Sequence, residues 1–126
     1  MRVADLRLSD KKIALRVLVL EISPTRSFPV VSDDRVHRVS KALVGDETGS
    51  IWLSLWDDAI DQVRVGKTID LENAYTTLYK NALFLNIGRF GRIRESAVPI
   101  EKTNLKNNLS EKELPSFSSW TAGKES

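Results

Sequence analysis

Apolar and polar residues alternate over much of the first ninety residues, which predicts a chain built from β-strands. The alternation is clearest over residues 50–56 (SIWLSLW). Because successive strand side chains point to opposite faces, one face there carries Ile51, Leu53 and Leu55 and the other carries Trp52, Ser54 and Trp56. The aliphatic face predicts a core. The opposite face predicts a surface that carries two indole rings.

Four other segments have the same character and predict four more strands. They are rich in Val, Ile, Leu and aromatic residues, and they cover residues 12–23, 35–44, 68–78 and 83–90. In the last of them we expect the inward side chains to be Leu83, Leu85 and Ile87.

The connections between these strands have different compositions. Residues 24–34 hold two prolines and a Ser-Asp-Asp cluster, which predicts a long exposed loop. Residues 45–49 (GDETG) predict a hairpin turn in which Asp46 accepts backbone N–H bonds and Gly49 is left-handed. Residues 57–66 predict a short helix with an aspartate cap and a glycine stop. Five strands with a helix between the third and fourth form the order of an OB-fold barrel, so we expect an all-β fold.

Length and composition predict one domain with an extension. The chain has 126 residues, and beyond residue 99 apolar side chains become scattered among Pro, Ser, Asn, Lys and Glu. We therefore expect an OB-fold domain over residues 1–95 and a flexible tail over residues 96–126. No apolar run is long enough to span a membrane, and no secretory signal opens the sequence. A cytoplasmic protein is the expectation.

Most catalytic and metal chemistry lacks its usual residues. There is no cysteine and only one histidine, His37, so thiolate zinc sites, cysteine nucleophiles and multi-histidine metal sites are excluded. Asp57 and Asp58 are adjacent and diverge, and a helix cap explains them better than a two-metal nuclease site. We expect a non-enzymatic protein without metal or cofactor.

The outward aromatic residues point to a binding surface for nucleic acid. Trp52 and Trp56 share one strand face, and the next predicted strand adds Tyr75 and Tyr79. Exposed aromatic clusters mark interfaces, and base–aromatic stacking stabilises a complex by about 1–3 kcal/mol per base. The net charge is only +2, so phosphates must meet a local set of cations, for which the candidates are Arg26, Arg38, Lys41, Lys80 and Arg89.

Four segments carry a resemblance to a known family. Residues 42–49, 53–56, 66–67 and 72–80 resemble, in order and spacing, the archaeal single-OB-fold single-stranded-DNA-binding proteins and their eukaryotic relatives. The resemblance covers about residues 1 to 95. It implies base stacking on three aromatic residues, Trp56, Tyr75 and Tyr79. Two further aromatic residues, Trp52 and Phe84, occupy positions that are often polar in the family, where they would add stacking platforms or dock the tail.

The tail departs from the archaeal members of that family. The Gly/Arg-rich stretch and acidic tip of those proteins are absent. Residues 113–118 (ELPSFS) instead resemble a short segment that follows the OB fold in eukaryotic relatives. We therefore expect residues 113–120 to be a partner-binding segment for repair or replication proteins.

Two classes of function remain open. The first is a monomeric protein that binds single-stranded DNA with little sequence preference and protects strands in replication, recombination and repair. The second is an OB-fold protein-interaction subunit that buries the aromatic face or the tail against a partner. A variant of the first prefers RNA, because stacking does not depend on the 2′-hydroxyl.

Overall fold

The alternating segments form the strands that the sequence predicts. The computed structural model of the protein describes residues 1–30 and 35–111. Its strands are β1 (Ile13–Ile22), β2 (Arg26–Val30), β3 (Arg35–Asp46), β4 (Gly49–Trp56), β5 (Thr68–Tyr79) and β6 (Ala82–Glu95). Five of these match the expected strands, and β2 is an addition.

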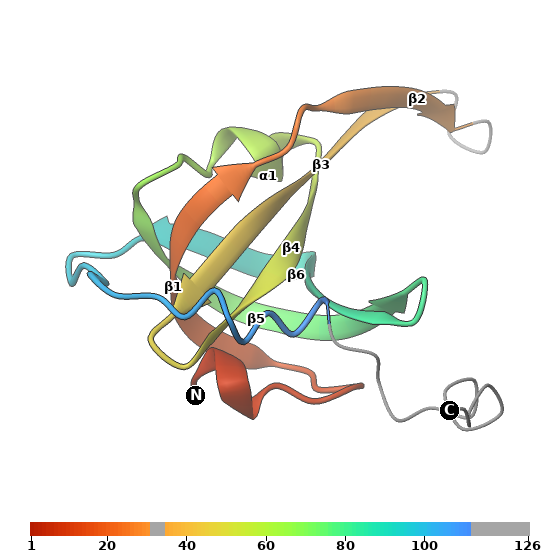
Figure 1. Cartoon of the computed structure of the whole chain (residues 1–126). Coiled ribbons are helices and arrows are strands. Elements are labelled where there is room, and N and C mark those ends of the chain that lie inside the picture. The colour runs from red at the N-terminus through yellow and green to blue at the C-terminus, as the bar shows by residue number, and fades with distance from the viewer. Residues whose placement is uncertain (31–34, 112–126) are drawn as a thin grey trace, which may run out of the picture.

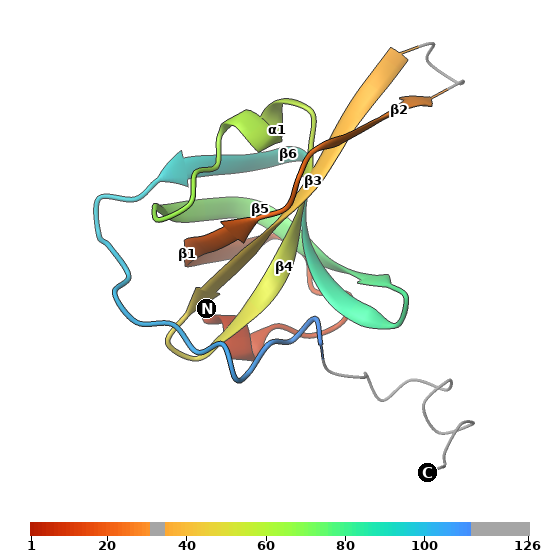
Figure 2. The ribbon, with the colours of Figure 1, turned by 45° about the horizontal axis from the view of Figure 1, so that its top comes forward.

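The sheet closes into a barrel through β1, β3, β4, β5 and β6. Figures 1 and 2 show the closed barrel. The sheet order is β1-β5-β6-β4-β3-β2, and a further pairing of β1 with β3 joins the two ends of the barrel. The pairing of β4 with β6 is parallel, and the other pairings are antiparallel. This arrangement confirms the all-β OB-fold prediction.

The expected loop over residues 24–34 is wrong for residues 26–30, which form β2. This strand pairs with β3 from Arg26 opposite Val39 to Val30 opposite Arg35. It lies at the edge of the sheet, where Pro29 is tolerated because one side of an edge strand bonds no neighbour. Together β2 and the first part of β3 make a ribbon that projects from the barrel (Figure 2).

The barrel interior is filled by aliphatic side chains, and a short helical segment lies near each end. Ile51, Leu53 and Leu55 are fully buried, as the alternation predicts. At the bottom of Figure 1 the 3-10 helix η1 (Val3–Asp5) inserts Val3 into the core. The helix α1 (Asp58–Asp61) lies near the other end and is shorter than the expected residues 57–66. Within the described ranges, no helix has the length and apolar character needed to cross a membrane.

The β3–β4 turn confirms one prediction and corrects another. The Asp46 carboxylate accepts hydrogen bonds from Thr48 N at 2.8 Å and Gly49 N at 3.3 Å, and also from Val3 N at 2.9 Å. Gly49 does not adopt the expected left-handed conformation. Glycine is needed there for a different reason, because a Cβ at this position would lie 2.9 Å from Asn107.

Residues 96–111, which we call the strap, run across the outside of the barrel (blue in Figure 1). The expectation of a flexible tail from residue 96 onward is wrong for this part. Ser50 N donates to Asn107 O at 3.0 Å, and Leu109 N donates to Ser50 O at 2.8 Å. The β4–β6 pairing begins only at Trp52, so the strap supplies backbone partners where β4 has no β6 neighbour. The expected partner-binding segment 113–120 lies outside the described residues.

Candidate nucleic-acid interface

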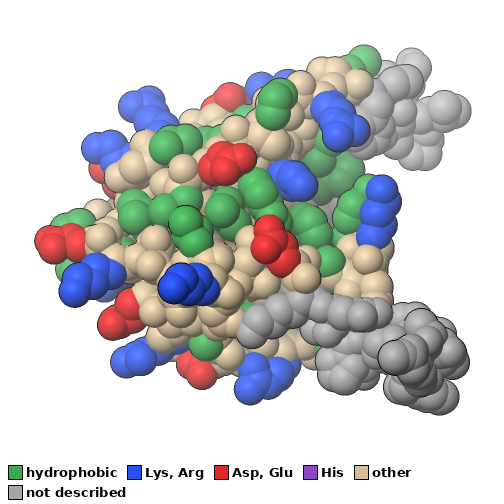
Figure 3. Space-filling view, in the orientation of Figure 1, with side chains coloured by type: hydrophobic (Ala, Val, Ile, Leu, Met, Phe, Trp, Pro, Cys, Tyr) green, Lys and Arg blue, Asp and Glu red, His purple; other side chains and the backbone are tan. Residues whose placement is uncertain are grey.

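The candidate site is the outward face of β4, β5 and β6. Two hairpins project on the same side of the barrel, the β2–β3 ribbon and the end of the β5–β6 pair (Figures 1 and 2). Hydrophobic and basic side chains lie along the edge of the molecule between these hairpins in Figure 3. The face is therefore framed by two projections.

Strand register arranges the outward side chains in rows across this face. Trp52 on β4 pairs with Phe84 on β6, and Phe84 pairs with Thr77 on β5. Two residues further along β4, Ser54 pairs with Asn86, and Asn86 pairs with Tyr75. Trp56 begins the next row. Trp52 and Trp56 are four residues apart, so about 13 Å separates them along the strand, and they occupy opposite ends of the face.

The first end is an open pocket of about 600 Å³. Its aromatic members are Trp56, of which 43% is exposed, and Tyr75, which is half-buried. The remaining described residues that line it are Ser54, Ala59, Gln62, Asn86, Ile87, Gly91 and Ile93. The structure therefore brings two of the predicted stacking residues, Trp56 and Tyr75, into one hollow. We call Ser54, Trp56, Tyr75 and Asn86 the pocket end of the face.

At the second end the aromatic rings contact one another or a cation. The rings of Tyr79 and Phe84 meet edge to face, with centroids 5.7 Å apart. Lys41 Nζ lies 4.5 Å from the centroid of Trp52 and 5.9 Å from that of Phe84. Only 9% of Phe84 is exposed, whereas 58% of Tyr79 is. Phe84 thus supports its neighbours, and Tyr79 and Trp52 offer the accessible surface. We call Lys41, Trp52, Tyr79 and Phe84 the strap end.

The strap holds this second end through Ser110. The buried Ser110 hydroxyl donates to Leu83 O at 2.5 Å and accepts from Trp52 N at 2.9 Å. It thereby joins the residue before Phe84 on β6 to Trp52 on β4. Ser110, which was expected to lie in a flexible tail, therefore fixes the backbone that carries the Trp52 and Phe84 rings.

The predicted phosphate contacts fall into different environments. Lys41, Lys80 and Arg26 are exposed, and Arg26 pairs with Val39, which pairs in turn with Trp56. Lys80 Nζ lies 5.4 Å from the Tyr79 ring centroid. The structure thus places Lys41 and Lys80 against aromatic rings, and Arg26 two strands away from Trp56. The Arg89 side chain lies outside the described part of the chain.

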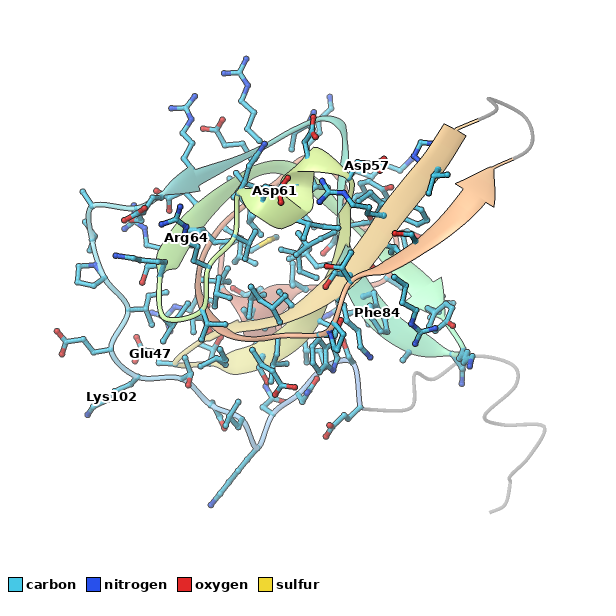
Figure 4. All side chains as sticks on the ribbon, turned by 90° about the horizontal axis from the view of Figure 1, so that it is seen from above. Glu47, Asp57, Asp61, Arg64, Phe84 and Lys102 are labelled. Carbon is cyan, nitrogen blue, oxygen red and sulfur yellow. The ribbon has the colours of Figure 1, made fainter. Side chains whose placement is uncertain are left out.

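Arg38 is engaged by acidic residues beside α1. Arg38 Nη2 donates to Asp61 Oδ2 at 3.0 Å and to Asp57 O at 3.1 Å. The hydrogen bond and charge of Arg38 lower the pKa of Asp61. Figure 4 shows Asp57 and Asp61 together at α1, on the side of the molecule away from Phe84. A phosphate would have to compete with these carboxylates for Arg38.

Asp57 corrects the expected helix cap. It occupies the N-cap position of α1, but its side chain makes no capping bond. Its carboxylate instead accepts hydrogen bonds from Arg38 N at 3.0 Å and from His37 Nδ1 at 2.7 Å. These bonds, the backbone bond first, lower the pKa of Asp57. The carboxylate therefore ties the end of β4, beside Trp56, to β3.

Comparison with known proteins decides the family. Residues 7–95 match the family described as single-stranded DNA binding protein Ssb-like, OB fold. The chain belongs to this family. The match ends at the last residue of β6, before the strap begins.

Two archaeal relatives have names that refer to DNA. The single-stranded DNA binding protein Ssb of Saccharolobus solfataricus is 33% identical over 96 residues, which cover 76% of this chain and 64% of that protein. Replication factor A of Methanothermobacter thermautotrophicus is 31% identical over 101 residues, which cover 76% of this chain and 13% of that protein. The Ssb-like chain thus spans less than two thirds of each.

Solved structures share the fold. A hypothetical protein from Arabidopsis thaliana has a TM-score of 0.79 at 27% identity, with 94% of this chain and 88% of that chain covered. The second OB-fold domain of replication protein A from Methanococcus maripaludis has a TM-score of 0.63 at 19% identity, with 80% and 98% covered. The latter likeness concerns the fold alone.

Sequence reasoning missed the polar part of the pocket and the role of the strap. Ser54 was recognised as outward, but nothing in its local pattern associates it with Asn86, which lies 32 positions later and becomes its neighbour through parallel pairing. The outward position of Asn86 between the inward Leu85 and Ile87 was the available signal. The strap has no alternating pattern, so its pairing with β4 has no signature in the sequence.

Proposed function

We propose that this Ssb-like protein binds single-stranded DNA without strong sequence preference and catalyses no reaction. The observation that supports this proposal most strongly is that Trp56 and Tyr75 line one open pocket on the outward face of the OB barrel. The family and the archaeal relatives named for single-stranded DNA binding and replication support the same conclusion.

Bases would stack on the accessible aromatic surfaces. Trp56 and Tyr75 serve the pocket end, and Tyr79 and Trp52 continue the path at the strap end, where Phe84 supports them. Base–aromatic stacking stabilises such complexes by about 1–3 kcal/mol per base, so three platforms supply about 3–9 kcal/mol before ordering costs. A micromolar complex requires about 8 kcal/mol in total, which this surface can reach.

The backbone of the strand would follow the exposed cations. Lys41 and Lys80 flank the strap end, and Arg26 lies beyond Trp56 on the ribbon. Arg38 contributes less because Asp61 holds its guanidinium. Arg89 is a further contact on β6. About three phosphate contacts give a log–log salt slope near −2 for a single strand.

The biological role that fits such binding is strand protection during replication, recombination and repair. The protein would act as a monomer in the cytoplasm, with several copies lining a long strand. Residues 113–120 would engage repair or replication proteins. Single-stranded RNA would also bind, since the stacking surface does not select against a 2′-hydroxyl.

The test is fluorescence anisotropy with a labelled oligothymidine, followed at several salt concentrations. We expect the affinity to fall with salt at a log–log slope near −2. Unlabelled duplex of equal length should not displace the labelled strand. Competition by matched RNA measures the preference between DNA and RNA. The absence of binding to any single strand would refute the proposal and favour the protein-interaction alternative, to be pursued by pull-downs with and without residues 99–126.

A further inference from the structure

We propose that Asn86, assisted by Ser54, hydrogen-bonds the Watson–Crick edge of a base that enters the pocket, and that it does so without selecting among the bases. This inference deepens the proposed function and rests on it. It assigns Asn86 a positioning role in binding that differs from the stacking of Trp56 and Tyr75.

The pocket has a polar part between its aromatic rings. Ser54 and Asn86 are half-buried neighbours on parallel strands, and both line the hollow beside Trp56 and Tyr75. Across residues 1–30 and 35–111, no side-chain hydrogen bond is made by the Ser54 hydroxyl or the Asn86 amide. Their donors and acceptors are thus available to a ligand.

The charge of the pocket also favours a base over a phosphate. Among the described residues that line the pocket, none is charged. The exposed cations, Lys41 and Arg26, lie outside this lining. The described lining residues offer a phosphate no cation, whereas a base offers an apolar face to the rings and a polar edge to the amide. The pocket therefore fits the base, and the phosphates remain with the cations around it.

An asparagine at this position can bind any of the four bases. An asparagine amide presents one carbonyl acceptor and an N–H donor side by side, and it can rotate by 180° about its last bond. Each of the four bases presents an adjacent donor and acceptor on its Watson–Crick edge, the edge that proteins use in unpaired nucleotides. For each base, one of the two orientations of the Asn86 amide therefore matches its donor and acceptor. Asn86 would detect that an unpaired edge is present, not which base carries it.

The experiment compares Asn86→Leu with the wild-type protein on three oligomers. Leucine keeps the approximate size of the side chain and removes the amide. The oligomers are oligothymidine, oligodeoxycytidine and an oligothymidine with N3-methylthymine at every position. Its rings can still stack, but a methyl group replaces the N3–H donor and so breaks the adjacent donor–acceptor pair. Thr77→Val is the matched control, because it removes one hydroxyl from the same face outside the pocket lining.

We expect Asn86→Leu to weaken binding to oligothymidine and to oligodeoxycytidine by similar factors of about three to ten. On the N3-methylated oligomer the variant and the wild type should differ much less, because only one of the two hydrogen bonds remains possible there; this comparison completes a double-mutant cycle. Thr77→Val should bind oligothymidine like the wild type. Unfolding curves of both variants check that the barrel is intact.

Three results would overturn the inference. Unchanged binding of Asn86→Leu to oligothymidine would remove Asn86 from the base contact. An equal loss on unmodified and methylated oligomers would show that the substitution acts through the shape of the face. A loss confined to one base would refute the claim of tolerance. In all three the wild type still binds single strands, so the proposed function survives; failure of the wild type to bind any oligomer would end both.

Discussion

The two ends of the aromatic face are built differently, although both display large rings on the same strands. At the pocket end, Trp56 and Tyr75 border an open hollow that the polar side chains of Ser54 and Asn86 also line. At the strap end, Tyr79 and Phe84 contact each other, and Lys41 lies over Trp52 and Phe84. One end leaves room between its side chains, and the other has largely filled it.

This difference shows that an outward aromatic residue has more than one role. Trp56 lines the hollow and 43% of it is exposed, so its accessible indole surface is open to a base. Trp52 already has a cation against its ring and a strap residue on its backbone. We therefore assign recognition of bases chiefly to the pocket end, and support and phosphate attraction chiefly to the strap end.

The largest expected effect is on affinity at the pocket end. Trp56→Ala should weaken binding to oligothymidine by about 1–3 kcal/mol, because it deletes a stacking platform, and should leave stability nearly unchanged, because Trp56 is 43% exposed. Trp52→Ala is the matched variant and should cost less affinity. Anisotropy titrations of both measure the difference, and an equal or larger loss for Trp52→Ala would reverse the assignment.

The next effect is on stability at the strap end. Ser110→Ala removes the hydroxyl that joins Trp52 N to Leu83 O and leaves both buried backbone groups without this partner. We expect the free energy of unfolding to fall by about 1–3 kcal/mol, measured by urea denaturation. Ser96→Ala, at an exposed part of the strap, should change it much less. Equal stability of Ser110→Ala and the wild type would show that the strap does not support the barrel.

A smaller effect separates the cations. Lys41→Gln should weaken binding severalfold and should make the log–log salt slope less steep by about 0.7, the value for one phosphate contact on a single strand. Arg38→Gln should alter the slope less, because Asp61 already holds Arg38. Salt titrations of the two variants give the comparison directly, and a larger change for Arg38→Gln would place the strand beside α1 instead.

The smallest effect is the pH dependence at the junction beside Trp56. Bonds from Arg38 N and from His37 hold the pKa of Asp57 below its usual value. A lowered folded-state pKa stabilises the fold above the unfolded value of about 3.9, and this contribution is lost as the pH falls through the folded value. Asp57→Asn should therefore lose less stability than the wild type between about pH 5 and pH 3. Parallel denaturation curves across this window would refute the role of Asp57.

The sequence allowed the barrel to be predicted because each of its strands carries a local, period-two signal. Ile51, Leu53 and Leu55 were assigned to the core from alternation alone, and the structure buries all three. β2 was not predicted because its proline and neighbouring polar residues are typical of loops. A strand at the edge of a sheet tolerates them. The strap was not predicted because its order depends on backbone hydrogen bonds to β4, and no local sequence pattern indicates these bonds.

The site was predicted in part for the same reason. Local alternation placed Trp56 and Tyr75 on outward faces, but only the pairing of β4, β5 and β6 brings them to one pocket. Asn86 likewise becomes a candidate binding residue only because the same pairing places it beside Ser54 and Tyr75. The direction of a side chain is a local property. Its neighbours across the sheet are set by the register of strands that are distant in the sequence.

The central claim, that bases stack at the pocket end, is tested most directly by tryptophan fluorescence in two variants that each keep one barrel indole. The variant that retains Trp56 carries Trp52→Phe and Trp120→Phe, and the variant that retains Trp52 carries Trp56→Phe and Trp120→Phe. Each is titrated with oligothymidine, and anisotropy verifies binding. We predict strong quenching of Trp56 and weaker quenching of Trp52. Intact binding with unchanged Trp56 fluorescence would contradict the account.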